Sequence, residues 1–121
     1  MGSWLDIDAV RPRRPRRGHR GLAEVRIYGP LNMLTVAEQE QRIFAAMTGS
    51  DADVLLDLTH VTRVTAVGLQ MVRYVQSVLH RTGRDLVLVG DHPDLHRRLR
   101  ELGVDMVMPV YATRALALAS R

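Results

Sequence analysis

The short apolar run over residues 54–58 constrains the fold of this chain more than any other feature. It reads Val-Leu-Leu-Asp-Leu, and a run of this length is typical of a buried strand. A polar stretch follows, and from Gly68 apolar residues return at helical spacing. The pattern predicts a strand over 53–58, a loop over 59–67 and a helix from Gly68 to Thr82. Backbone N–H groups point outward at such a helix start, where phosphate groups are often handled.

Strand and helix patterns alternate along the rest of the chain. Apolar alternation predicts strands at Trp4–Val10 and Ala23–Tyr28, with Gly29-Pro30 ending the second, and apolar runs predict strands at Leu86–Val89 and Met106–Met108. Helices are expected from a capping box at Thr35 to Gly49, from Pro93 to Leu102, and after Thr113. This order predicts an α/β fold with one mixed sheet of four to five strands and helices packed mainly on one face.

Composition sets the class of protein. The chain has 121 residues, of which 46% are hydrophobic and 25% charged, which suits a single domain over 1–121. It contains no cysteine, so disulfides and zinc–thiolate sites are excluded. No apolar run is long enough to span a membrane, and the first residues lack an apolar signal region. We therefore expect a cytoplasmic protein with no membrane partner.

Positive charge is concentrated near the start of the chain. Residues 1–20 hold six arginines and two aspartates, whereas the other 101 residues hold 11 arginines and 11 acidic residues. The segment 11–20 has no apolar residue and is predicted to be a basic loop or arm. Together with Arg97, Arg98 and Arg100 it offers one alternative function, the binding of a polyanion or nucleic acid. Aromatic residues make up only 4% of the chain, which leaves few side chains for base stacking.

Several local sequences, in their order and spacing, resemble the STAS family, the domain named for sulfate transporters and anti-sigma factor antagonists. The resemblance extends from about residue 4 to 120 and implies the STAS sandwich of sheet and helices. The matching segments are Gly29-Pro30-Leu31-Asn32, Val54-Leu55-Leu56-Asp57-Leu58, Val61-Thr62-Arg63-Val64, Gly68-Leu69, Arg84 to Gly90, and His96 to Gly103.

The resemblance also shows where this chain departs from its family. In the antagonists, a serine or threonine in an Asp-Ser-Ser/Thr-Gly loop is phosphorylated by a partner kinase that is also the anti-sigma factor. Here the Asp position holds Thr65, and the two hydroxyl positions hold Ala66 and Val67, which cannot accept phosphate. The resemblance thus implies a docking surface without the usual phosphorylation switch. Thr65 is a candidate surrogate phosphoacceptor, although loop threonines also commonly bond to nearby backbone.

A partner-binding surface follows from the same resemblance. The expected partner is an anti-sigma factor of the serine-kinase type, or another regulatory protein in sigma factor and transcription control. Val67 is expected either to be exposed as an apolar contact or to pack against the sheet edge. The expected surface comprises the loop, the start of the next helix and nearby residues: Leu31, Asn32, Thr62, Thr65, Ala66, Val67, Gly68, Leu69, Gln70, Arg73 and Tyr74.

No motif points to catalysis, so we expect no enzyme activity and no cofactor. The serines do not lie in nucleophile motifs, and Gly68 lacks the glycine and lysine pattern of a phosphate-binding loop. His92 and His96 are four residues apart, but no third ligand is evident, so we expect no metal site. A structural scaffold that forms a homodimer remains a further alternative to partner binding.

Overall fold

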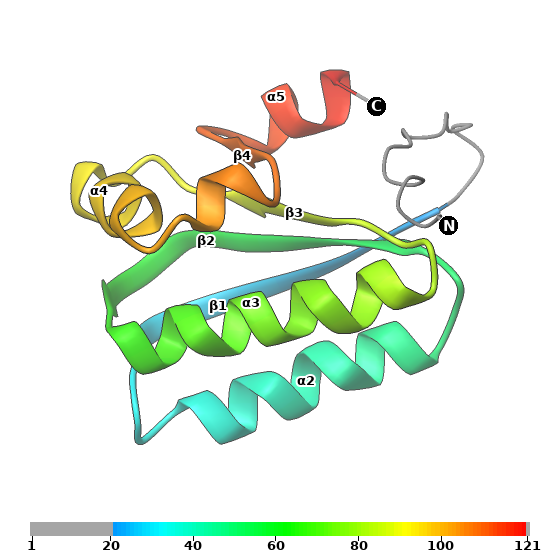
Figure 1. The fold of residues 1–121 in the computed structure, drawn as a ribbon, viewed down its shortest axis with the longest axis horizontal. Helices are drawn as coiled ribbons and strands as arrows, with labels where there is room; N and C mark the ends of the chain where they lie inside the picture. The colour runs from blue at the N-terminus through cyan, green and yellow to red at the C-terminus, as the bar shows by residue number, and fades with distance from the viewer. Residues whose placement is uncertain (1–20, 121) are drawn as a thin grey trace, which may run out of the picture.

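Within residues 21–120 the strands form one four-stranded sheet in which every neighbouring pair is parallel (Figure 1). A computed structural model describes residues 21–120. It confirms the predicted α/β fold with a single sheet. The strand expected at Trp4–Val10, which would have made the sheet mixed, and the basic segment 11–20 lie outside the described residues. In sheet order the strands are β1 Leu22–Leu31, β2 Asp53–Val64, β3 Leu86–Val89 and β4 Val110–Tyr111.

Two long helices cover one face of the sheet, and a short helix packs on the other (Figure 1). None of the helices within residues 21–120 is long and apolar enough to cross a membrane. The two long helices are α2 Val36–Thr48 and α3 Ala66–Arg81, the short one is α5 Arg114–Ala119, and α4 Pro93–Glu101 leads into a 3-10 turn, η1 Val104–Met106.

Burial on both faces explains the apolar run in β2. Leu56 and Leu58 belong to the main core beneath α2 and α3, whereas Leu55 packs with Ala117 of α5 on the opposite face. A strand covered on both sides needs apolar residues at successive positions rather than alternation. The run that dominates the sequence is therefore the centre of the molecule.

The loop predicted over 59–67 is wrong for most of its length, because β2 continues to Val64. Val61 and Val64 are buried in the main core, and the second half of β2 pairs with the end of β1. The expected break at Gly29-Pro30 does not end β1 either. Gly29 takes a positive φ of 81° where the register shifts, so the strand passes through an irregularity and continues to Leu31.

The second predicted helix starts at Ala66, two residues before the glycine that was expected to open it. Gly68 instead lies in the first turn, where α3 approaches the end of β1. A Cβ at this position would lie 2.8 Å from Leu31 Cγ and 2.9 Å from Leu31 O. The glycine is needed for close packing between α3 and β1, not for beginning the helix.

Two further local predictions need correction. The strand expected at Met106–Met108 is replaced by η1 and the following turn, and the strand in this region is β4. Thr35 does precede α2, but its side chain makes no capping bond to the helix. Its hydroxyl donates to the carbonyl of Pro30 at 2.8 Å and accepts from the Asn32 amide at 3.1 Å, which fixes the preceding loop.

Charged side chains fasten the end of the sheet at which β2 and β3 begin. Arg84 donates through Nε to Ala52 O at 2.8 Å and through Nη2 to Met47 O at 2.9 Å, which joins three segments. The buried carboxylate of Asp53 accepts from the Asp85 amide at 2.8 Å. These charge-assisted bonds satisfy backbone groups that no strand or helix pairs at this end.

Candidate partner-binding site

The loop between β1 and α2 holds two large apolar side chains in solvent. Met33 is 77% exposed and Leu34 is 91% exposed. The loop is fixed from behind, because Asn32 Oδ1 accepts from the Leu34 amide at 2.9 Å and from the Thr35 amide at 3.3 Å. Because these hydrogen bonds hold the backbone, the two side chains are presented outward by a defined turn.

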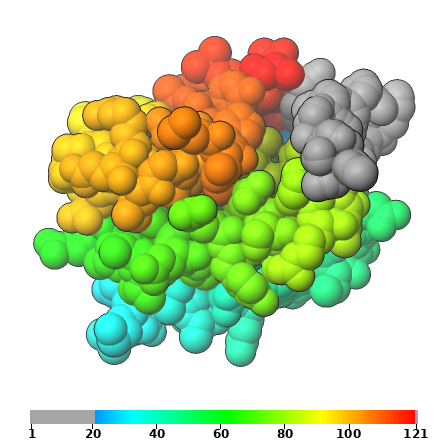
Figure 2. All heavy atoms as spheres, viewed as in Figure 1, coloured from blue at the N-terminus to red at the C-terminus, as the bar shows by residue number. Residues whose placement is uncertain are grey.

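The start of α3 is attached to the same region of β1. Thr65 donates to Leu31 O twice, from its amide at 3.1 Å and from Oγ1 at 3.3 Å. The Thr65 hydroxyl therefore faces β1 and does not cap α3, and the first turn of α3 has no acidic residue. Figure 1 places this helix start and the β1–α2 loop at the same end of the molecule, and Figure 2 shows the loop protruding beside it.

The two positions that lack a hydroxyl lie on the first turn of α3. Ala66 is exposed and Val67 is half-buried, so Val67 is neither fully exposed nor fully covered. Thr62 is exposed on β2, whereas Thr65 is half-buried and bonded to Leu31. The start of α3 thus presents methyl groups at the two positions where the resemblance to the antagonists predicts a hydroxyl.

The remaining predicted surface residues separate into two groups. Leu31, Gly68 and Leu69 are buried, so they support the surface and do not form it. Gln70, Arg73 and Tyr74 are exposed along α3. Tyr74 remains 52% exposed, with its ring 6.0 Å from the Phe44 ring of α2.

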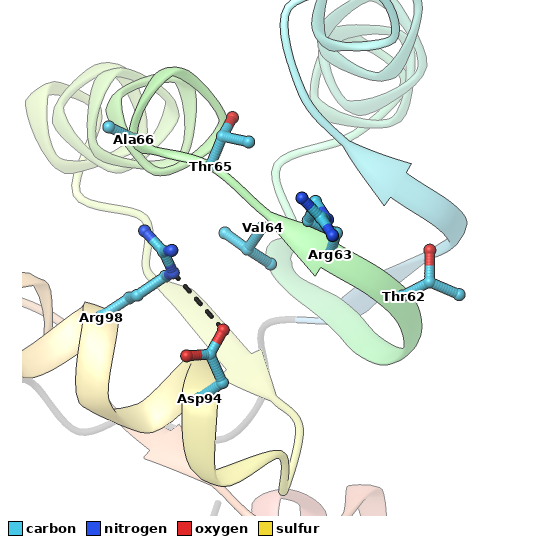
Figure 3. A pocket seen from close by; sticks show the side chains of 7 residues that line it. All are labelled: Thr62, Arg63, Val64, Thr65, Ala66, Asp94 and Arg98. Carbon is cyan, nitrogen blue, oxygen red and sulfur yellow. Dashed lines mark hydrogen bonds and ion pairs between the residues drawn. The ribbon is translucent and has the colours of Figure 1, made fainter.

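A pocket of about 380 Å³ adjoins the helix start on the side of α4 (Figure 3). Arg98 reaches from α4 toward Ala66, and its Nε lies 3.4 Å from Asp94 Oδ2. Asp94 also accepts a hydrogen bond from Arg97, which holds the pKa of the Asp94 carboxyl below its ordinary value. The pocket is lined by Thr62, Arg63, Val64, Thr65, Ala66, Asp94 and Arg98.

Sequence reasoning missed the most exposed apolar residues of this region. Met33 and Leu34 lie outside any periodic segment, so the apolar pattern gave them no role. Two adjacent large apolar residues between a strand end and a helix start are themselves a signal, because turns usually carry polar residues. Arg63 was noticed only as part of a matching segment, although the structure places it with Arg98 around one pocket.

The two histidines considered as metal ligands are each engaged by backbone. His92 Nε2 lies 3.1 Å from Thr59 O, and His96 Nε2 lies 2.6 Å from Gly90 O. Across residues 21–120, no three side chains of the metal-binding types gather in one place.

Comparison with known proteins gives the family. The family model for the STAS domain matches residues 14–117, and the chain belongs to this family. It is similar to the crystal structure of an anti-sigma factor antagonist from Mycobacterium paratuberculosis, with 26% identity, a TM-score of 0.76, and coverage of 84% of this chain and 86% of that one. No curated protein matches it.

Two more distant structures share the fold. A sulfate transporter family protein from Wolinella succinogenes has 21% identity and a TM-score of 0.72, with coverage of 83% of this chain and 84% of that one. The anti-sigma factor antagonist SpoIIAA in its unphosphorylated form has 17% identity and a TM-score of 0.62, with coverage of 84% and 89%. The similar structures thus include both kinds of protein for which the family is named, a sulfate transporter family protein and anti-sigma factor antagonists.

Proposed function

We propose that this protein regulates transcription by binding an anti-sigma factor of the serine-kinase type, and that its binding is not switched by phosphorylation of the α3 start. The interaction takes place in the bacterial cytoplasm, where sigma factors act. The proposal is supported by the family and by the similarity to an anti-sigma factor antagonist at 26% identity. The contact surface is formed by Met33, Leu34, Ala66, Val67 and Tyr74, which we call the docking surface.

The observation that carries the proposal is the pair of exposed apolar side chains at Met33 and Leu34, in the loop after Leu31, to whose carbonyl the α3 start is hydrogen-bonded. The fixed turn holds these large apolar groups in water, where they contribute no free energy of burial. A partner that covers them would remove apolar surface from water and gain binding free energy. The exposed ring of Tyr74 suits the same purpose, since aromatic residues and methionine are enriched at protein interfaces.

The absence of a switch follows from side-chain chemistry. Ala66 and Val67 have no atom that can accept a phosphoryl group, and the Thr65 hydroxyl is half-buried against Leu31 O. A phosphate would add roughly −1.5 to −2 charge and would repel a partner already docked on the apolar surface. Without an acceptor at Ala66 or Val67, phosphorylation of the first turn of α3 cannot switch binding.

The test uses purified anti-sigma factor kinases from the same genome, with binding measured by calorimetry before and after incubation with ATP. Wild-type protein should bind one of them with an affinity that ATP leaves unchanged. Ala66→Ser introduces a hydroxyl at an exposed position, so this variant should become phosphorylated and dissociate from the kinase. Ala45→Ser introduces a hydroxyl at an exposed position of α2 and should not be phosphorylated. Phosphate on Thr65 of the wild type, found by mass spectrometry, would refute an unswitched interaction.

A second arm of the test locates the surface. Leu34→Ser and Val67→Glu should each weaken binding by roughly tenfold or more, because each removes or charges an apolar contact. Leu116→Ser, on the exposed side of α5, is the matched control and should bind as the wild type does. Equal binding by all three variants would show that the partner contacts another face.

A further inference from the structure

The pocket beside the docking surface contains more positive than negative charge. Arg63 makes no hydrogen bond or ion pair with any side chain in residues 21–120, and Arg98 has one contact of 3.4 Å, to Asp94. Asp94 is shared with Arg97, which also meets Glu101 at 3.2 Å. Of the charged side chains that line the pocket, two are arginines and one is a carboxylate, which leaves a surplus of one positive charge.

The neighbouring backbone does not offset this surplus. The first turn of α3 has no acidic side chain, and Thr65 gives its hydroxyl to Leu31 O and not to the helix. The backbone N–H groups of the first turn of α3 add partial positive charge to the side of the pocket that Ala66 forms. Figure 3 shows Arg98 extending toward this wall, with Arg63 across Val64 on β2.

We propose that this pocket receives the carboxylate of an aspartate or glutamate side chain from the protein that covers the docking surface, held between Arg63 and Arg98. The inference rests on the proposed function, since it gives the chemistry of that same partner. Thr65 and Ala66 line the pocket, and Ala66 also forms part of the docking surface, so one partner can occupy both places.

A single carboxylate fits the pocket better than a phosphate. The surplus of one positive charge matches a monoanion, and an arginine guanidinium binds a carboxylate through paired, charge-assisted hydrogen bonds. Asp94 lines the same pocket and would repel a dianionic phosphate more strongly than a carboxylate. The acidic group thus adds specificity to an interface whose affinity comes from apolar contacts.

The first experiment uses a small probe and the full chain. N-acetyl-aspartic acid α-amide carries one carboxylate, and N-acetyl-asparagine α-amide is its neutral counterpart. Titration followed by NMR should give saturable shifts at the Arg63 and Arg98 Nε–H signals and at the Ala66 amide with the acid only. Arg98→Gln should weaken the binding several-fold, whereas Arg100→Gln, an exposed α4 residue outside the pocket lining, should not.

Three results with the wild-type chain would overturn the proposal. These are shifts that do not saturate, shifts of equal size with the neutral amide, and tighter binding of N-acetyl-O-phosphoserine α-amide than of the aspartic acid derivative. The last result would identify a phosphorylated partner residue as the occupant. An unchanged response in Arg98→Gln would place the probe elsewhere on the chain and would also contradict the assignment.

The second experiment separates this inference from the proposed function. With the anti-sigma factor as partner, the double variant Arg63→Gln/Arg98→Gln should bind roughly tenfold more weakly and with a smaller dependence on salt. If Leu34→Ser weakens binding and the arginine variant does not, the docking surface is correct and the pocket assignment fails. If no anti-sigma factor binds but the carboxylate probe still gives saturable shifts at the Arg98 Nε–H signal, the proposed function fails and the carboxylate site stands.

Discussion

The two ends of the parallel sheet are built in opposite ways. Where β2 and β3 begin, Arg84 and Asp53 bond to backbone groups of neighbouring segments. Where β1 and β2 end, Met33 and Leu34 lie in water, and α3 starts without a side-chain cap. Polar groups are thus satisfied at one end, while apolar and positively charged groups are left available at the other.

This difference agrees with the proposal that one end of the sheet serves the fold and the other serves binding. In open parallel sheets, ligands bind beyond the carboxyl ends of the strands, where the loops are free to vary. The exposed groups here lie at that end. Hydrogen bonds to Asn32 fix the backbone of the β1–α2 loop, but they do not bury its side chains. The contrast predicts that changes at one end alter stability, and at the other alter binding.

The strongest challenge to this division is Gly68, which is structural although it lies at the binding end. Gly68→Val places a Cβ within 3 Å of Leu31 Cγ and Leu31 O, and a backbone oxygen cannot turn aside as a side chain can. Overpacking of this kind should lower the free energy of unfolding by about 1–3 kcal/mol or more. Urea denaturation followed by circular dichroism measures the change.

Gly49→Ala is the matched control for Gly68. Its φ is −79°, and a Cβ there would meet only carbonyl oxygens at 3.6 and 3.9 Å. The free energy of unfolding should stay the same or rise slightly, since alanine restricts the unfolded chain. A Gly68 variant as stable as the wild type would mean that α3 can move away from β1, and that the helix start is not fixed in place.

At the opposite end, Arg84→Ala should have a comparable effect. It removes hydrogen bonds to Ala52 O and Met47 O, and leaves both carbonyls without their charged donor. We expect a loss of about 1.5–3 kcal/mol in the free energy of unfolding, with binding to the partner unchanged. Arg81→Ala, an exposed residue at the end of α3, should cost less than about 0.5 kcal/mol. Equal losses in both variants would contradict a special role for Arg84.

The parts of the fold that the sequence predicted are those in which local pattern and packing agree. β3 was predicted with its bounds intact, because Leu86–Val89 is a short apolar run buried on both sides. The second half of β2 was missed because Thr59, His60 and Arg63 are exposed, and their place in a strand depends on pairing with β1. No local pattern encodes that pairing.

The candidate site was predicted in part, for a similar reason. The importance of the α3 start followed from the order of a strand, a polar stretch and a helix, which local sequence records. The role of Gly68 was misread, because its contact with Leu31 joins segments far apart in the chain. Arg63 and Arg98 likewise line one pocket only because the fold places α4 beside the end of β2. Long-range contacts of this kind leave no periodic trace in one sequence.

An ion pair between β1 and α5 offers a smaller, pH-dependent test of the structural end. Arg114 donates to both carboxylate oxygens of Glu24 at 2.6 and 2.8 Å, and this hydrogen bonding lowers the pKa of the Glu24 carboxyl. A depressed folded-state pKa stabilises the fold above the unfolded-state pKa, and that contribution is lost as pH falls through the folded value. Because both side chains are partly exposed and water screens their charges, the contribution at neutral pH should be small.

The measurement compares the free energy of unfolding of the wild type with that of Arg114→Gln, from neutral pH down into the acid range in which Glu24 becomes protonated. The difference in the free energy of unfolding should be largest near neutral pH and should shrink toward zero in acid, where Glu24 is protonated in both proteins. A difference that stays constant with pH would mean that Arg114 stabilises α5 through its packing rather than through its charge.

The smallest expected effect on stability is at the docking surface itself. The double variant Met33→Ala/Leu34→Ala removes two side chains that are mostly exposed, so the free energy of unfolding should change by less than about 0.5 kcal/mol while partner binding is lost. Met106→Ala, at an 85% exposed position in η1, should change neither property. If the double variant instead unfolds markedly more easily, these apolar groups serve the fold, and the division between the two ends of the sheet does not hold.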